Sequence, residues 1–195
     1  IAYRKDLVFE DSQKELILGQ SCFENTNLSN VVIPKRVTEI GAYAFSNNPN
    51  LVLISFEEGA LCSVIMEGAF SNIGSAEIAD SGMEFGALVG YDYFAYNEDR
   101  RVELPLNVET IGDYAFKDTS SYTDIILNEG LLTIGQGAFY GCKGITFMRI
   151  PYTVTLIDDM AFYGCSSLQN VEITSDDEYT LGSYVFADCA GLTSL

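Results

Sequence analysis

A phenylalanine returns along this chain at a nearly constant interval of about 23 residues, and this period restricts the possible folds more than any other feature. It closes a six-residue motif that is clearest as Ile111-Gly-Asp-Tyr-Ala-Phe116, Ile134-Gly-Gln-Gly-Ala-Phe139 and Ile157-Asp-Asp-Met-Ala-Phe162. With the looser copies, the phenylalanines of the motif are Phe23, Phe45, Phe70, Phe94, Phe116, Phe139, Phe162 and Phe186. Such a period is typical of a solenoid, so the sequence predicts about eight stacked coils.

A short stretch of alternating apolar residues follows each motif. The inward members include Ile54 and Phe56, Ile125 and Leu127, Met148 and Ile150, and Val171 and Ile173. This alternation predicts a strand with one buried face. Pro34, Pro105 and Pro151 come directly after such stretches, and proline cannot donate to a ladder. We expect these strands to form a parallel sheet on one face of the solenoid.

The motif itself predicts a tight backbone and a buried ring. The glycine after the isoleucine indicates a conformation or a close approach that a side chain would prevent. We expect the Tyr-Ala-Phe segment to form a short helical turn that places the phenylalanine in the interior. Residues 71–88 depart from the pattern and carry Gly74, Gly82 and Gly86, which predicts an irregular coil or a protruding loop where the sheet can be interrupted.

The combined motif Ile-Gly-x-x-Ala-Phe-x-x-Cys-x-x-Leu-x-x-Ile-x-Ile-Pro-x-x-Val resembles the BspA-like class of leucine-rich repeats. Residues 134–173 match it almost throughout, and residues 18–195 match in outline. The resemblance implies a right-handed leucine-rich-repeat solenoid, mostly β with short helical turns. It also implies a secreted or surface-displayed protein, of bacteria or some protists, that adheres to host matrix proteins or to other cells and has no catalytic residues.

The chain is expected to be one domain. We interpret residues 1–195 as a single solenoid, and since the chain begins with Ile1 and stops at Leu195 within a repeat, as a fragment of a longer protein. No run approaches 18 consecutive apolar residues, so no transmembrane helix is predicted.

Charge and composition exclude several functions. The chain has 28 acidic and 10 basic residues and a net charge of −18, which argues against nucleic acid and anionic membranes as partners. It fits a basic partner or simply a solvated surface. Without histidine there is no Ser-His-Asp or Cys-His site, and we expect no metal or cofactor. A carboxylate hydrolase stays open, although the adjacent pairs Asp158-Asp159 and Glu57-Glu58 are better interpreted as turn charges.

Three of the five cysteines occupy one position of the repeat. Cys142, Cys165 and Cys189 each lie three residues after a motif phenylalanine. Stacked coils are about 5 Å apart, which brings neighbouring thiols near disulfide range. Other coils hold Thr26, Asn48, Ile73 or Thr119 there, which indicates a small buried slot. We therefore predict buried, reduced thiols, with disulfides as the alternative.

A solenoid binds through side chains that alternate away from its core. Outward positions of the predicted strands include Asn30, and four outward positions are apolar: Val32, Leu53, Ile126 and Phe147. Phe147 and Arg149 are the first candidates, because rings and guanidinium groups are frequent in binding hot spots. Plain β-propensity is the alternative explanation. Tyr91 and Tyr93, in a tyrosine-rich stretch, form a second candidate.

The predicted function is a non-catalytic extracellular scaffold that binds a protein or glycan. The alternative is a structural spacer or stalk that displays another domain.

Overall fold

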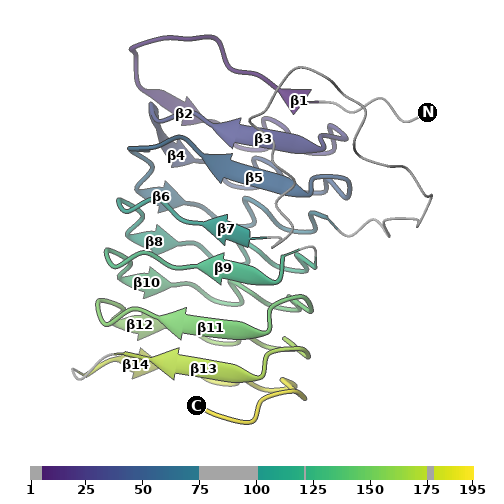
Figure 1. Ribbon diagram of the computed structural model, residues 1–195, viewed down its shortest axis with the longest axis vertical. Helices are drawn as coiled ribbons and strands as arrows, with labels where there is room; N and C mark the ends of the chain where they lie inside the picture. Colours follow the sequence, from purple (N-terminus) through teal and green to yellow (C-terminus); the bar gives the residue numbers. More distant parts are fainter. Residues whose placement is uncertain (1–5, 75–100, 121, 175–177) are drawn as a thin grey trace.

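The chain folds into a β-solenoid whose coils stack along one axis (Figure 1). The computed structural model describes residues 6–74, 101–120, 122–174 and 178–195. Within these ranges each coil contributes one strand to a front layer and one to a back layer, and all pairing is parallel. Between the layers lies a continuous apolar core that runs through every described coil.

The front layer confirms the predicted parallel strands, but its ladders are interrupted. The front strands are β1 (Asp6–Leu7), β3 (Asn30–Ile33), β5 (Leu53–Phe56), β7 (Arg101–Glu103), β9 (Asp124–Ile126), β11 (Phe147–Ile150) and β13 (Asn170–Ile173). Ladders join β1 to β3 to β5, β7 to β9, and β11 to β13. No described ladder joins β5 to β7 or β9 to β11.

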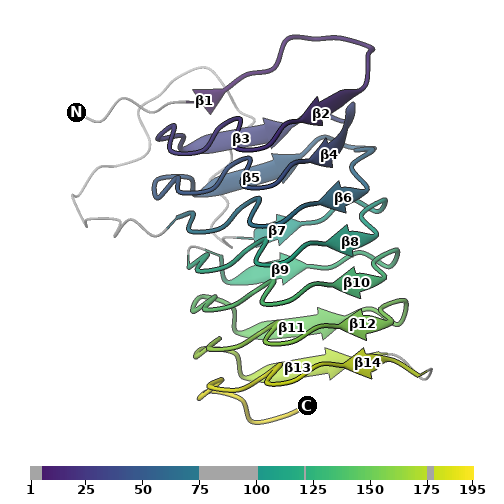
Figure 2. The same ribbon diagram turned by 180° about the vertical axis from the view of Figure 1, so that it is seen from behind.

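The back layer is a second, unbroken sheet that the sequence analysis did not predict. Its seven strands are β2 (Leu16–Leu18), β4 (Val37–Ile40), β6 (Val64–Ile65), β8 (Thr110–Ile111), β10 (Thr133–Ile134), β12 (Leu156–Ile157) and β14 (Thr180–Leu181). Figure 2 shows them in this order from behind. Ile40, Ile65 and Ile111 are the isoleucines that open the motif in their coils, and all are fully buried.

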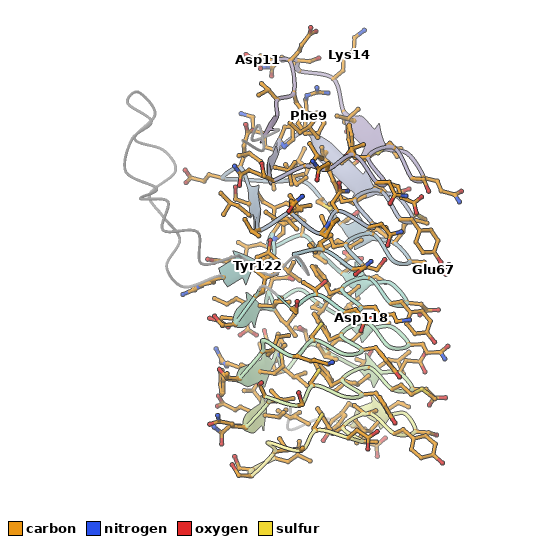
Figure 3. All side chains as sticks on the ribbon, turned by 90° about the vertical axis from the view of Figure 1, so that its right-hand side faces the viewer. Phe9, Asp11, Lys14, Glu67, Asp118 and Tyr122 are labelled. Atoms are coloured by element: carbon orange, nitrogen blue, oxygen red, sulfur yellow. The ribbon has the colours of Figure 1, made fainter. Side chains whose placement is uncertain are left out.

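The motif phenylalanines form a stack through the interior, as predicted. Phe23, Phe45, Phe70, Phe116, Phe139, Phe162 and Phe186 follow one another with centroids 5.1–5.4 Å apart and planes within 19° of parallel. The five inner rings are fully buried, and those of Phe23 and Phe186 are partly buried. Phe9 meets Phe23 edge-on at 6.1 Å near the N-terminal end of the solenoid (Figure 3).

The predicted register is wrong at one step of this stack. The rings of Phe70 and Phe116 are direct neighbours, β6 pairs with β8, and the backbone N–H of Gly68 donates to the Asp113 carbonyl at 2.8 Å. The coil predicted at Val89–Phe94 therefore does not separate them, and Phe94 itself lies outside the described residues. The coil that contains Phe70 takes its front strand from β7.

The predicted helical turns are also wrong, because a left-handed residue begins both Tyr-Ala-Phe segments and the equivalent Tyr184-Val-Phe186. Tyr43, Tyr114 and Tyr184 have φ angles of 58°, 55° and 58°, which no α-helix accommodates. Short turns replace the helix: the Ala44 N–H donates to the Gly41 carbonyl at 3.1 Å, and the Ser46 N–H to the Tyr43 carbonyl at 3.0 Å. No helix occurs in the described ranges.

The motif glycine has the predicted role of permitting close approach between coils. A Cβ on Gly41 would lie 2.5 Å from the carbonyl oxygen of Leu18 in the preceding coil, and one on Gly112 would lie 2.7 Å from the carbonyl carbon of Met66. The glycine thus allows the backbone bond from the Gly41 N–H to the Leu18 carbonyl, at 2.8 Å.

Candidate binding surface

The outward side chains of the front strands form a regular grid, which we call the front face. In the first row Leu53 lies beside Asn30, Arg101 beside Asp124, and Phe147 beside Asn170. In the second row Ser55 lies beside Val32, Glu103 beside Ile126, and Arg149 beside Glu172. Neighbouring strands of a ladder lie about 4.8 Å apart, so side chains in register on them can contact one partner together.

The front face divides the predicted residues into two groups. Val32 and Leu53 lie on the paired strands β3 and β5. Phe147 and Arg149 lie on β11, which neighbours the strand β9 that carries Ile126 (Figure 1). Strand β7 separates the two groups. Tyr91 and Tyr93 lie outside the described residues, so this second candidate remains a prediction.

The group on β9 and β11 combines an exposed ring with a cationic side chain. Phe147 is 43% exposed, which is high for a phenylalanine. The Arg149 side chain is 57% exposed, and its guanidinium lies 3.7 Å from the Glu129 carboxylate. An ion pair this exposed contributes little stability, so Arg149 can exchange Glu129 for a partner's acceptor at small cost.

Strand β7 places charges between the two apolar groups. The Arg101 guanidinium lies 3.8 Å from the carboxylate of Glu103 and 4.0 Å from that of Asp124. The front face therefore alternates between apolar and charged patches along the solenoid axis, and a long partner would meet both.

The prediction that Asn30 points outward from its strand is wrong, because its side chain is buried. Leu7, Phe9 and Ser12 of the N-terminal segment line a cavity of about 550 Å³ together with Asn30 and Val32. Strand alternation alone could not predict the burial of Asn30.

The cysteine column is buried, as predicted, and no disulfide joins its thiols. All five cysteines are free, and Cys142, Cys165 and Cys189 are buried. Their thiols donate to the carbonyls of Phe116, Phe139 and Phe162 in the preceding coils at 3.0–3.1 Å. Burial raises the pKa of Cys142 and keeps this thiol protonated. A protonated, enclosed thiol is a poor nucleophile and a poor metal ligand.

The slot three residues after each phenylalanine is therefore a position for a hydrogen-bond donor, which the sequence analysis described only as small. Asn48 Nδ2 donates to the Phe23 carbonyl at 2.7 Å, and Thr119 Oγ1 donates to the Phe70 carbonyl at 2.9 Å. Ile73 has no donor to offer Phe45, and there Asn48 Nδ2 donates a second time, to the Phe45 carbonyl at 2.9 Å. The Asn, Thr and Cys residues at this slot share a hydrogen-bond donor rather than a particular size.

The described residues provide little for catalysis. They contain no group of three or more Cys, Asp or Glu side chains placed to hold a metal ion. The pair Asp158-Asp159 caps backbone N–H groups: Asp158 Oδ1 accepts from Asp159 at 2.7 Å, and Asp159 Oδ1 accepts from Ser183 at 2.6 Å. In the same ranges the chain forms no helix that is long and apolar enough to cross a membrane.

The BspA type leucine rich repeat region, in six copies, matches residues 9–83 and 88–195. The chain therefore belongs to this family, as the resemblance implied. No curated protein matches the chain.

Solved structures of leucine-rich-repeat proteins share the fold. A leucine rich repeat protein of T. pallidum superposes with a TM-score of 0.72 at 23% identity, over 91% of this chain and 72% of that one. A leucine rich cell surface protein of Faecalibacterium prausnitzii gives 0.53 at 22% identity, over 91% of this chain and 50% of that one. A leucine-rich repeat protein of Eubacterium ventriosum gives 0.52 at 20% identity, over 98% and 47%. The chain thus spans half or less of the last two proteins.

Proposed function

We propose that this chain is a non-catalytic scaffold that binds a protein or glycan partner through its front face, with the contact centred on Ile126, Phe147 and Arg149. The observation that carries the proposal is the exposed ring of Phe147 on the same strand as the exposed guanidinium of Arg149. Burying such a ring against a partner contributes binding free energy, and the guanidinium supplies directional hydrogen bonds.

An extracellular or cell-surface location belongs to the same proposal. It is supported by family membership and by the fold shared with a protein described as a leucine rich cell surface protein. Adhesion to a host matrix or cell-surface protein is the specific role that we propose. Four buried free thiols are compatible with that location, since a closed core shields them from external oxidants.

An array of immobilised matrix proteins, cell-surface proteins and glycans tests the proposal. We expect the chain to bind at least one of them, and Phe147→Ala or Arg149→Ala to weaken that binding about tenfold or more. Thr180→Ala, at an exposed position on β14 of the back sheet, is the control and should bind normally.

The array also separates this proposal from the alternative of a spacer or stalk. A spacer needs only the regular stack of coils, so it predicts no binding above background for the unaltered chain. Binding that both Phe147→Ala and Arg149→Ala leave unchanged would place the contact on another surface.

A further inference from the structure

The front face opens into a cleft at the step from β5 to β7. These strands belong to consecutive coils, yet no described ladder joins them. At the back of the same two coils β4 and β6 are paired, and inside them Phe45 stacks on Phe70 at 5.3 Å. The coils therefore pair at the back and stack in the core, whereas at the front β5 and β7 lie side by side without a ladder and border a cavity of about 560 Å³.

The lining of this cleft is apolar at its base and along its sides. Ile54 and Leu104 are core residues, each 2% exposed, that also reach the cavity. Leu53 and Phe56 are only partly buried, and Leu106 is 79% exposed. An apolar side chain that entered the cleft would remove part of this surface from water, which is favourable.

The rim of the cleft is acidic. Glu57, Glu58 and Glu103 line it, and Arg101 is the only basic residue among its described lining. The Arg101 guanidinium is already engaged by Glu103 and by Asp124 of the next strand. In a chain with a net charge of −18 this rim attracts cations and repels anions.

Strand β7 lies beside the other edge of β5 without a ladder between them. A ligand would therefore reach the cleft with its side chains rather than by adding a strand to β5.

We propose that the cleft between β5 and β7 binds an extended segment of a partner protein that inserts one aromatic or large aliphatic side chain and carries Lys or Arg on either side of it. The inference rests on the proposed function and specifies the partner's chemistry at a second part of the front face. The volume lies within the range of roughly 300–1,000 Å³ found for small-ligand clefts, enough for one ring and a short stretch of backbone. The carboxylates of Glu57, Glu58 and Glu103 would meet the flanking cations.

The test uses a fluorescently labelled Lys-Lys-Phe-Lys-Lys peptide, with versions in which Ala replaces Phe or Glu replaces every Lys. Anisotropy measures affinity, and amide chemical shifts of the chain locate the site. We expect saturable binding of the first peptide, shifts concentrated in β5 and β7, about tenfold weaker binding of the Ala version, and no binding of the Glu version.

Charge-neutral variants of the chain make the test specific. Glu58→Gln combined with Glu103→Gln should weaken binding several-fold, and Ser55→Trp, which fills the cleft from β5, should abolish it. The matched control combines Glu129→Gln with Glu172→Gln, which removes two carboxylates elsewhere and should leave affinity within twofold.

Three results would overturn the inference: no saturable binding, equal affinity for the Glu peptide, or equal weakening in the control. If the peptide does not bind at the cleft but Phe147-dependent binding on the array is intact, only this inference is wrong. Loss of array binding with intact peptide binding would remove the proposed contact at Phe147 instead.

Discussion

The ring of Phe70 stacks on the ring of Phe116 at a centroid distance of 5.3 Å, although almost two repeat lengths of sequence separate the two residues. The same contact is made by the backbone, since the Phe70 N–H donates to the Ala115 carbonyl at 2.7 Å. The continuity of the solenoid is therefore set by stacking and pairing between coils, and not by a strict count of residues along the chain.

The motif glycine provides the first prediction. Gly41→Ala should lower the free energy of unfolding by about 1–3 kcal/mol, because the new Cβ would press on the Leu18 carbonyl oxygen, 2.5 Å away. Gly19→Ala is the matched control: it alters the same motif position, where a Cβ meets nothing within 4 Å. We expect it to change stability by less than about 1 kcal/mol. Urea denaturation measures both, and equal effects would contradict the close-approach explanation.

The donor slot provides the second prediction. Cys142→Thr should be more stable than Cys142→Val by about 1 kcal/mol or more, because only threonine can donate to the Phe116 carbonyl, as Thr119 donates to Phe70. The two replacements have nearly the same shape, so packing is held constant. Chemical denaturation of both variants decides the point. A valine variant as stable as the threonine variant would show that donation to this carbonyl contributes nothing.

The third prediction concerns alkaline pH. Burial, together with the nearby Glu39 carboxylate, raises the pKa of Cys62 from an ordinary value of 9.0 to about 11. The folded chain thus holds a proton that the unfolded chain releases. This contribution, roughly 3 kcal/mol, is complete below pH 9 and is lost as the pH rises through 11.

Stability measured between pH 8 and pH 11 should therefore fall, and Cys62→Ala should fall less steeply than the unaltered chain. Other buried thiols leave a residual slope in both. Identical slopes for the two proteins would refute the assignment to Cys62.

Tyr122 provides the fourth prediction. It fills the core position that Leu51 and Leu168 fill in other coils, beside the front strands (Figure 3). Its hydroxyl is buried without a hydrogen-bond partner among the described residues. Burial raises the pKa of this hydroxyl, and the nearby Ile54 backbone offsets only part of the effect.

Tyr122→Phe should therefore be neutral or stabilising by up to about 1 kcal/mol, since it removes an unsatisfied polar group and keeps the ring. Tyr122→Leu should cost about 1–3 kcal/mol through the lost volume. Thermal denaturation compares the two variants. A Tyr122→Phe variant that is clearly less stable than the unaltered chain would reveal a bonded hydroxyl.

The features of the fold that repeat with the period could be predicted from the sequence. The Phe stack, the close-approach glycine and the alternating front strands each depend on one residue type at one position, which recurs often enough to identify. The back sheet was missed because strands such as Thr110–Ile111 are too short to show alternation. The turns were assigned as helical because nothing in the sequence marks Tyr43 or Tyr114 as left-handed; this region favours Gly and Asn.

The register error and the cleft have physical causes outside the local sequence. Phe94 recurs at the right interval, so spacing alone could not exclude it from the stack, and the direct contact of Phe70 with Phe116 excludes it. Alternation placed Val32, Leu53, Ile126 and Phe147 on outward positions of the front strands. The cleft depends on how far β5 and β7 separate, which is a property of packing between coils.

The most direct test of the account is a nuclear Overhauser measurement between the phenylalanine rings of a sample with assigned, selectively labelled Phe. The structure predicts cross-peaks between the rings of Phe70 and Phe116, as strong as those between Phe45 and Phe70, since both pairs have centroids 5.3 Å apart. Absence of the Phe70–Phe116 cross-peak, with cross-peaks from each of these rings to a third ring between them, would contradict the account.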